Sequence, residues 1–344
     1  MAALGCGILE QLEFQYKKIL SDYMTDQTEK NLYIAQNFTR QLIQKNISPE
    51  DVVSVHKNAV EKLFPRRMSE EQLAYDFLIE VMVHYGMAHR EHQSLLQKQA
   101  EYEMEMKIAT NIQKTLLKTD VPQLSSIDIG MISIPIRKMN GDYVHFLYNR
   151  EDFLSVAVTD VVGKGVPAAL CMSMVKYGLE TLEYAYKDPS YVLEVINRVI
   201  EKSVDDSMFV SMFYGCLDVH KSIFSYASAG HEPALHYSAK HNKFFPLEST
   251  GLLLGVLPET KYSYNEIVLE ENDIVIMMTD GVTEFRAHNE MNSREVISSL
   301  ILENKHLSAQ QMCNLLYKRV EEIQDFKLSD DFTVAIIKNR FQSV

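Results

Sequence analysis

Several acidic residues of this 344-residue chain stand where strand-like segments begin or end, and they are its best candidates for chemistry. Asp160 and Asp280 each follow an apolar, partly β-branched segment, whereas Asp142 and the pair Asp330-Asp331 each precede one. In antiparallel sheets the end of one strand lies beside the start of its neighbour. These carboxylates can therefore converge on one edge of a sheet.

A cluster of carboxylates without nearby bases would raise the pKa values of its members and destabilise the fold. Divalent cations remove this repulsion, and ligation by oxygen alone favours Mg²⁺ or Mn²⁺ over zinc or copper. Two such ions roughly 3.5–4 Å apart can activate a water and stabilise a phosphoryl transition state. A nucleophilic side chain is then unnecessary. The alternative is that these residues are ordinary turn and cap aspartates.

The turn after Asp160 also matches a weaker motif. Residues 163–168, Gly-Lys-Gly-Val-Pro-Ala, have the GxGxxA form after a strand and before a helix, as in dinucleotide sites. Such a site needs a second parallel strand that ends in an acid about 20 residues later. A second helix follows here instead, which disfavours a dinucleotide site. The sequence contains no GxSxG, HExxH or P-loop motif.

The segments that must position these aspartates lie beyond Pro122. Strands followed by two helices, twice over, predict an α+β sheet sandwich covered by helices. The expected strands are 127–134, 143–148, 153–159, 212–217, 223–227, 234–237, 274–279 and 332–337, and the expected helices are 168–186, 190–202, 294–302 and 309–324.

The first part of the chain is helical in pattern. Apolar residues at steps of three and four over residues 8–96 predict a four-helix bundle, which we interpret as a binding module. Residues 93–117 predict one long helix. Its residues Leu95, Gln99, Tyr102, Met106, Ala109, Gln113 and Leu116 form a weak heptad seam. The helix is either a conditional coiled coil or a plain connector. The expected domains are 1–85, 86–120 and 121–344.

Three histidines lie close together near the end of the predicted bundle, namely His84, His89 and His92. A metal site is conceivable, but Cys or carboxylate partners at ligand spacing are missing. We interpret them as ordinary residues of the helix surface.

The composition disfavours several classes of protein. A net charge of −13 repels nucleic acid and anionic membranes, and no apolar stretch approaches the roughly 20 residues that span a bilayer. The start of the sequence lacks the pattern of an export signal. Four scattered cysteines fit a reducing compartment, so we expect a cytoplasmic protein without membrane or nucleic-acid partners.

Five motifs together resemble a known family: Gly141-Asp142-Tyr143, residues 160–165 (DVVGKG), residues 228–233 (SAGHEP), residues 279–284 (TDGVTE) and residues 330–333 (DDFT). They are similar to the SpoIIE branch of the metal-dependent PPM (phosphatase 2C-like) serine phosphatases. The whole chain, its helical start included, resembles the RsbU-like general-stress phosphatases of that branch. The resemblance implies an αββα sandwich of antiparallel sheets and an activity as a protein serine/threonine phosphatase.

The resemblance also implies roles for single residues. Asp160, Asp280 and Asp330 would hold two Mn²⁺ or Mg²⁺ ions and carry catalysis, together with the Val161 carbonyl. Asp142 would join them directly or through water, and Asp331 is the alternative to Asp330. The substrate-binding candidates are Arg137, Lys138, Lys164 and His231, and Lys164 stands where much of the family has histidine.

The implied substrate is a phosphorylated STAS-domain anti-anti-sigma factor (RsbV-like), whose dephosphorylation controls a stress sigma factor. The implied activator is an RsbT-like switch kinase that binds a helical domain of a homodimer. Two rival hypotheses remain. One is a catalytically inactive scaffold that binds the phosphoprotein, and the other is a phosphatase of a different partner-switching pathway.

Overall fold

The computed structural model describes residues 2–45, 47, 49–65, 68–136, 138–149, 153–163, 165–182, 187–203, 208–284, 293–324, 328 and 330–340. The chain forms two compact units, Met1–Glu105 and Met106–Val344. The division falls within one helix. The domain boundaries expected from the sequence stay a prediction.

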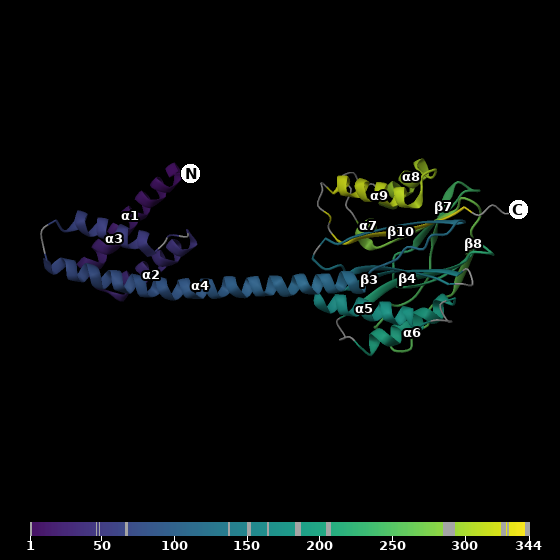
Figure 1. Ribbon diagram of the computed structural model, residues 1–344, viewed down its shortest axis with the longest axis horizontal. Helices are drawn as coiled ribbons and strands as arrows, with labels where there is room; N and C mark the ends of the chain where they lie inside the picture. The colour runs from purple at the N-terminus through teal and green to yellow at the C-terminus, as the bar shows by residue number, and fades with distance from the viewer. Residues whose placement is uncertain are drawn as a thin grey trace. The chain divides into compact units, whose positions relative to one another are not determined.

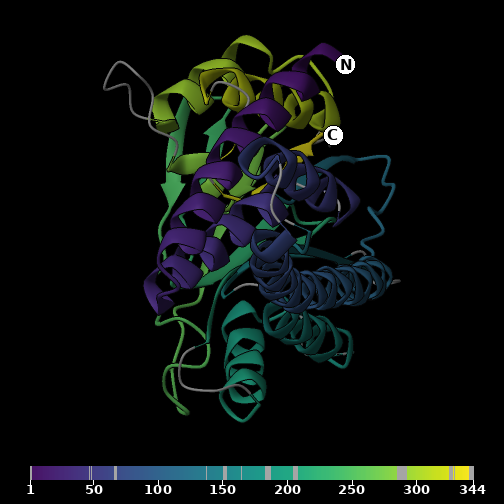
Figure 2. The same cartoon turned by 90° about the vertical axis from the view of Figure 1, so that its left-hand side faces the viewer.

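The first unit is helical. It contains α1 (Ala2–Thr25), α2 (Glu29–Gln44), α3 (Pro49–Leu63) and the first part of α4 (Met68–Leu116), which lie side by side (Figures 1 and 2). Leu12, Tyr16 and Leu20 recur at steps of four on α1 and are fully buried. They pack with Phe38 of α2 and Phe77 of α4 in one apolar core.

Helix α4 is longer than the sequence pattern indicated. The predicted fourth helix of the bundle and the predicted helix at 93–117 are one element of 49 residues. No proline interrupts residues 66–121, and Gly86 is the only glycine there. The helix therefore has no breaker at which to end. Among the described helices, none combines the length and the apolar character needed to cross a membrane.

The second unit is a sandwich of two five-stranded antiparallel sheets (Figure 1). In the first sheet the order is β1 (Ile127–Ile134), β10 (Phe332–Asn339), β9 (Ile274–Met278), β6 (Ala234–Ser238) and β7 (Lys243–Leu247). In the second it is β2 (Asp142–Tyr148), β3 (Phe153–Val162), β4 (Phe209–Asp218), β5 (Ile223–Ala229) and β8 (Asn265–Val268).

Helices cover both outer faces of the sandwich. Helices α5 (Val166–Glu180) and α6 (Pro189–Glu201) pack on the second sheet, and α9 (Ala309–Ile323) packs on the first beside α8 (Ser293–Glu303). The short α7 (Asp280–Thr283) follows β9. The predicted α+β sandwich is confirmed. Strands β7 and β8 were not predicted, because both are short edge strands with exposed residues and β7 contains a proline.

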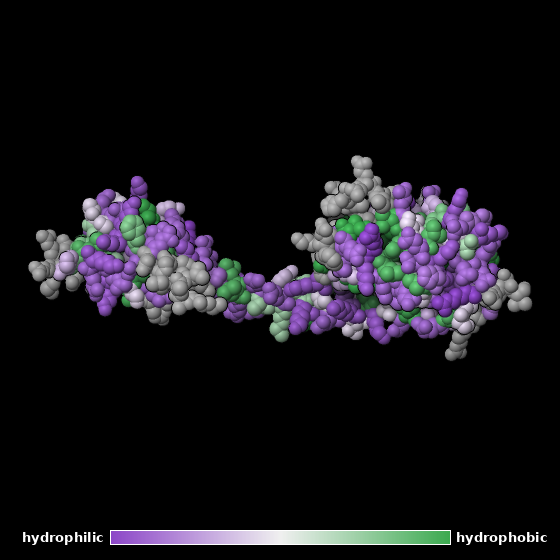
Figure 3. Space-filling view, turned by 90° about the horizontal axis from the view of Figure 1, so that it is seen from above, coloured by the Kyte–Doolittle hydropathy of each residue, from purple (hydrophilic) through white to green (hydrophobic). Residues whose placement is uncertain are grey.

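Alternation along the strands explains where the core lies. On β3, Leu154, Val156 and Val158 face the other sheet, whereas Ala157 and Val161 face α5 and α6. Both faces are therefore buried, which is why the strand is a continuous apolar segment. Hydrophilic residues predominate on the surface in view in Figure 3, with the hydrophobic ones in small groups.

Candidate metal centre

Asp160 and Asp142 meet at the end of β3. They are register partners in the antiparallel pair of β2 and β3. Because alternate residues of a strand share a face, Asp160 lies on the same face as Val156 and Val158. This face points between the sheets. Asp142 continues the corresponding face of β2, where Val144 belongs to the same core. The two carboxyls therefore lie at the rim of the core between the sheets.

Three further aspartates reach the same place from the other sheet. Asp280 opens α7 directly after β9, and Asp330 and Asp331 precede β10. A Cβ on Gly281 would lie 2.0 Å from the backbone oxygen of Asp331, so a glycine is needed where these segments cross. A cavity of about 300 Å³ lies between the groups. Its lining is Ile136, Met139, Gly141, Asp160, Val161, Val162, Gly163, Gly165, Ala168, Asp280, Asp330 and Asp331.

The neighbours Asp330 and Asp331 differ in their surroundings. Asp331 is buried, and its two carboxylate oxygens accept hydrogen bonds from the backbone N–H groups of Ile136 and Gly141, both at 2.7 Å. Asp330 is exposed, and its Oδ1 accepts one hydrogen bond, from the Asp331 N–H at 2.9 Å. Asp331 is thus engaged with the protein, and Asp330 keeps an oxygen for other partners.

The charged residues in the described lining of the cavity are all acidic. Burial and the charges of Asp280, Asp330 and Asp331 raise the pKa of Asp160 to about 7. Burial and the charge of Asp160 raise the pKa of Asp142 well above its usual value, and burial and Asp330 raise that of Asp280. None of the described lining residues is basic. The described lining residues therefore leave this negative charge uncompensated.

A cradle of oxygens beside Gly141 fits a hard cation. A Cβ placed on Gly141 would lie 3.5 Å from Asp331 Oδ2, 3.6 Å from Asp160 Oδ1 and 3.8 Å from the Val161 carbonyl oxygen. An all-oxygen donor set suits Mg²⁺ or Mn²⁺. Among the described residues, no three His, Cys or acidic side chains form a closed ligand group as they stand.

His231 is buried and joins the two sheets. Its Nε2–H donates to the Met278 carbonyl at 3.1 Å, so Nδ1 accepts from the Ser211 hydroxyl at 2.7 Å. Ser211 is the register partner of Asp160, and Met278 stands two residues before Asp280. Burial lowers the pKa of His231 to about 4, so the ring stays neutral. His231 acts here as a brace between two aspartate-bearing strands.

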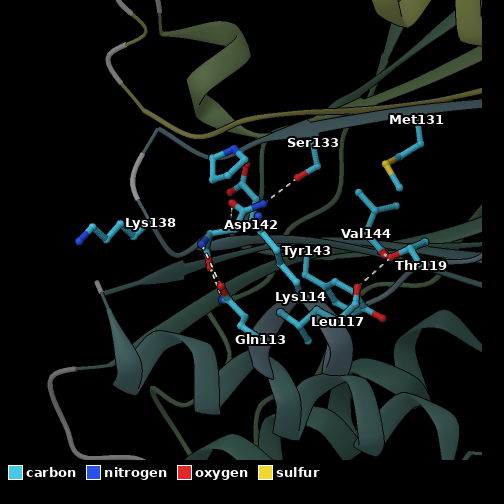
Figure 4. Close-up of a pocket in the computed structure, with 12 residues that line it drawn as sticks. Gln113, Lys114, Leu117, Thr119, Met131, Ser133, Lys138, Asp142, Tyr143 and Val144 are labelled. Atoms are coloured by element: carbon cyan, nitrogen blue, oxygen red, sulfur yellow. Dashed lines mark hydrogen bonds between the residues drawn. The ribbon is translucent and has the colours of Figure 1, made fainter. Parts of the chain in front are cut away.

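Of the predicted basic residues, Lys138 is the one whose position the described part of the chain shows. Lys138 is exposed and borders a different cavity, and in Figure 4 it points away from the other labelled side chains. Arg137 and Lys164 lie outside the described residues. In the helical unit, His84 contacts Gln36 and Glu80, and His89 stacks on Tyr85.

Two residues that support the aspartates had no assigned role in the sequence prediction. The Thr279 hydroxyl donates to Asp142 Oδ2 at 2.8 Å, and the Asn140 side-chain oxygen accepts from the Asp142 N–H at 3.0 Å. The second contact is an Asx turn, which an asparagine two residues before an aspartate can indicate. The contact of Thr279 with Asp142 joins the two sheets, and no pattern in the nearby sequence indicates it.

Comparisons with known proteins agree with this geometry. Residues 150–340 match the family model "Stage II sporulation protein E (SpoIIE)", and residues 14–88 match "Phosphoserine phosphatase RsbU, N-terminal domain". The chain is 44% identical over 331 residues to the phosphoserine phosphatase RsbU of Bacillus subtilis, covering 96% of this chain and 98% of that protein.

Two solved structures share the fold. The SiaA-PP2C domain of Pseudomonas aeruginosa is 15% identical with a TM-score of 0.60, and the match covers 71% of this chain and 99% of that one. RsbX in complex with magnesium is 18% identical with a TM-score of 0.50, over 64% of this chain and 98% of that one. The match to the SpoIIE model and the identity with RsbU place the chain in the SpoIIE family, among the RsbU phosphoserine phosphatases, which are metal-dependent enzymes of the PP2C-like class.

Proposed function

We propose that this phosphatase removes phosphate from a phosphoserine of a STAS-domain anti-anti-sigma factor, and that an RsbT-like switch kinase activates it by binding the helical unit. The identity of 44% with RsbU over nearly the whole chain, the helical unit included, supports this proposal. The reaction would take place in the cytoplasm, where the buried thiols of Cys171, Cys216 and Cys313 stay reduced.

The observation that carries the catalytic part is the acidic cavity without a described basic residue. Asp160, Asp280, Asp330 and the Val161 carbonyl would hold two Mn²⁺ or Mg²⁺ ions. Divalent ions, when bound, supply an activated water and neutralise charge on the phosphoryl group. RsbX, a protein of the same fold, was crystallised in complex with magnesium, which supports a divalent ion here.

The other residues of the site would position these ligands. Asp331 anchors the Ile136 and Gly141 backbone, and Asp142 is held by Thr279. His231 would brace the strands of Asp160 and Asp280. It would not exchange protons with the substrate, because both ring nitrogens already have partners. Phosphate capture would fall to residues outside the described part of the chain, Arg137 and Lys164.

The test is phosphate release from a phosphorylated STAS-domain protein, with and without Mn²⁺ and the switch kinase. We expect release to require the metal and to rise with the kinase, and Asp160→Asn to abolish it. Wild-type protein that binds the phosphoprotein but releases no phosphate under any condition would support the scaffold hypothesis. Full activity without the kinase would support the proposed phosphatase activity and would contradict activation by the kinase.

The activating step would act through α4. Leu95 and Tyr102 of the predicted seam are 58% and 63% exposed, so this stretch can take up a partner helix of a second copy. Replacing Glu103 and Met104 by a Gly-Gly pair should abolish activation and spare basal turnover. Retained activation would exclude an ordered coiled coil as the signal.

A further inference from the structure

One side chain at the end of α4 holds both backbone groups of a single residue near the acidic cavity. Gln113 Nε2 donates to the Asn140 carbonyl at 2.8 Å, and the Asn140 N–H donates to Gln113 Oε1 at 3.1 Å (Figure 4). Gln113 is only 5% exposed. This paired contact, the Gln113 clamp, imitates the pairing of two strands and fixes the Asn140 peptide groups in place.

The residues that follow Asn140 connect the clamp to the acids. The Gly141 N–H donates to Asp331 Oδ2 at 2.7 Å, and the Gly141 carbonyl accepts from the Val161 N–H at 3.2 Å. The Asn140 side chain accepts from the Asp142 N–H and donates to Ser133. A shift of Asn140 would therefore disturb Asp142 and two residues that line the acidic cavity, Asp331 and Val161.

On one side, this segment is held by hydrogen bonds and borders an open space. A second cavity of about 270 Å³ borders it, and Gln113, Leu117, Met131, Asn140 and Tyr143 are among its lining residues (Figure 4). Because this side of the segment is not filled by side chains, there is little steric resistance to its movement. Loss of the clamp should loosen the segment without collapsing the fold.

The clamp also changes the interpretation of the heptad seam. Gln113 is a predicted seam position, yet in the structure its side chain is buried and bonds Asn140 of the sandwich unit. The backbone after it is tied to the same unit, since Lys176 Nζ donates to the Leu116 carbonyl at 2.6 Å and the Thr119 hydroxyl to the Val144 carbonyl at 2.6 Å. A seam that ran through Gln113 would have to break the clamp, so the two arrangements compete.

We propose that Gln113 is a positioning residue that couples α4 to the metal centre: the clamp holds Asn140–Asp142 so that the oxygens around Gly141 can take a divalent ion. This inference rests on the proposed function for the identity of the site. Since loss of an outer hydrogen-bond partner typically costs 10–100-fold in metal affinity, breaking the clamp should weaken metal binding by about tenfold.

The experiment compares full-length wild type with Gln113→Met, which keeps the volume of the side chain and removes both hydrogen bonds. Binding of Mn²⁺ is measured from the loss of the free-ion electron paramagnetic resonance signal. We expect the dissociation constant to rise about tenfold. Hydrolysis of p-nitrophenyl phosphate should need a correspondingly higher Mn²⁺ concentration, with kcat at saturating Mn²⁺ within about twofold of wild type.

Gln97→Met is the matched control, because Gln97 is exposed on the same helix, off the seam, and its side-chain amide donates to the exposed Glu101. It should bind Mn²⁺ as wild type does. Gln113→Asn, whose amide is one methylene too short for the clamp, provides a second variant if Gln113→Met fails to fold. Unchanged Mn²⁺ affinity in a folded clamp variant overturns the inference. Wild type that binds Mn²⁺ but hydrolyses nothing overturns the proposed function and leaves the clamp standing.

Discussion

The two units of the chain bury polar groups in different ways. The helical unit buries a neutral pair, in which the Tyr16 hydroxyl contacts His56 Nδ1 at 2.8 Å inside an apolar core. The sandwich unit gathers five carboxyls at one rim, and burial and the neighbouring charges raise the pKa values of Asp142, Asp160 and Asp280 there. The first arrangement needs only the protein. The second is unfavourable unless opposite charge is supplied, which the proposed divalent ions would do.

The largest expected effect is that of Asp160→Asn. Hydrolysis should fall by more than the roughly 100-fold that is typical for loss of an outer hydrogen-bond partner, because Asp160 is a proposed ligand of the metal itself. Stability without metal should rise by about 1 kcal/mol, since one of the repelling charges is removed. Phosphate release and urea unfolding in EDTA measure the two effects.

Asp76→Asn, an exposed acid of the helical unit, should change neither quantity. If Asp160→Asn instead lowered stability in EDTA, the acidic rim would not be under repulsion. The contrast between the two units would then be lost.

Gly141→Ala should remove metal binding while keeping the fold. The added methyl meets oxygens only at 3.5–3.8 Å, an ordinary contact distance, but it fills the cradle that an ion would use. Wild type at Mn²⁺ one hundred times its dissociation constant should gain about 2.7 kcal/mol of stability, and the variant should gain none. Urea unfolding with and without Mn²⁺ gives the difference.

The control is Gly86→Ala on α4, because an added Cβ at Gly86 would have no described neighbour within 4 Å outside its own turn of helix. It should gain up to about 1 kcal/mol from helix propensity and keep the response to Mn²⁺. A Gly141→Ala protein that Mn²⁺ still stabilises would place the ion elsewhere.

In the helical unit, we expect the stability to depend on pH and not on metal. Burial lowers the pKa of His56 to about 4, below that of the unfolded chain at about 6.5. The unfolded state therefore binds the extra proton between these values, and stability falls as the pH drops from about 6.5 to about 4. The loss should be about 2 kcal/mol, discounted for partial access of water.

Hydrogen exchange of the helical unit at pH 7 and pH 5 measures this loss, with His56→Gln as the variant that cannot titrate. Because His145 and His231 have similarly lowered pKa values in the sandwich, only the difference between the two proteins counts. Equal pH dependence of both proteins would contradict the prediction.

The smallest effect is expected for Lys138→Ala. Lys138 is exposed and borders the cavity beside the clamp, not the acidic one. Steady-state hydrolysis of a phosphoserine substrate should change by less than about twofold in KM, as is usual for a solvated surface charge. A tenfold rise in KM would contradict this prediction, because it would show that Lys138 contacts the substrate.

The sequence predicted the convergence of the aspartates because strands have a fixed period and antiparallel neighbours meet end to start. It could not separate Asp330 from Asp331. Their difference depends on the N–H groups of Ile136 and Gly141, roughly two hundred positions away along the chain. The contact of Gln113 with Asn140 could not be predicted for the same reason, since Asn140 lies outside the helix and 27 positions away along the chain.

The brace formed by His231 makes the ring a built-in spectroscopic reporter. Its proton is held on Nε2 by the Met278 carbonyl, and its other nitrogen is occupied by Ser211. The ¹⁵N resonances of this one imidazole should therefore stay at the values of a single neutral tautomer across physiological pH. Any event that parts the two sheets at the acidic rim would become visible in those resonances, without substrate and without turnover.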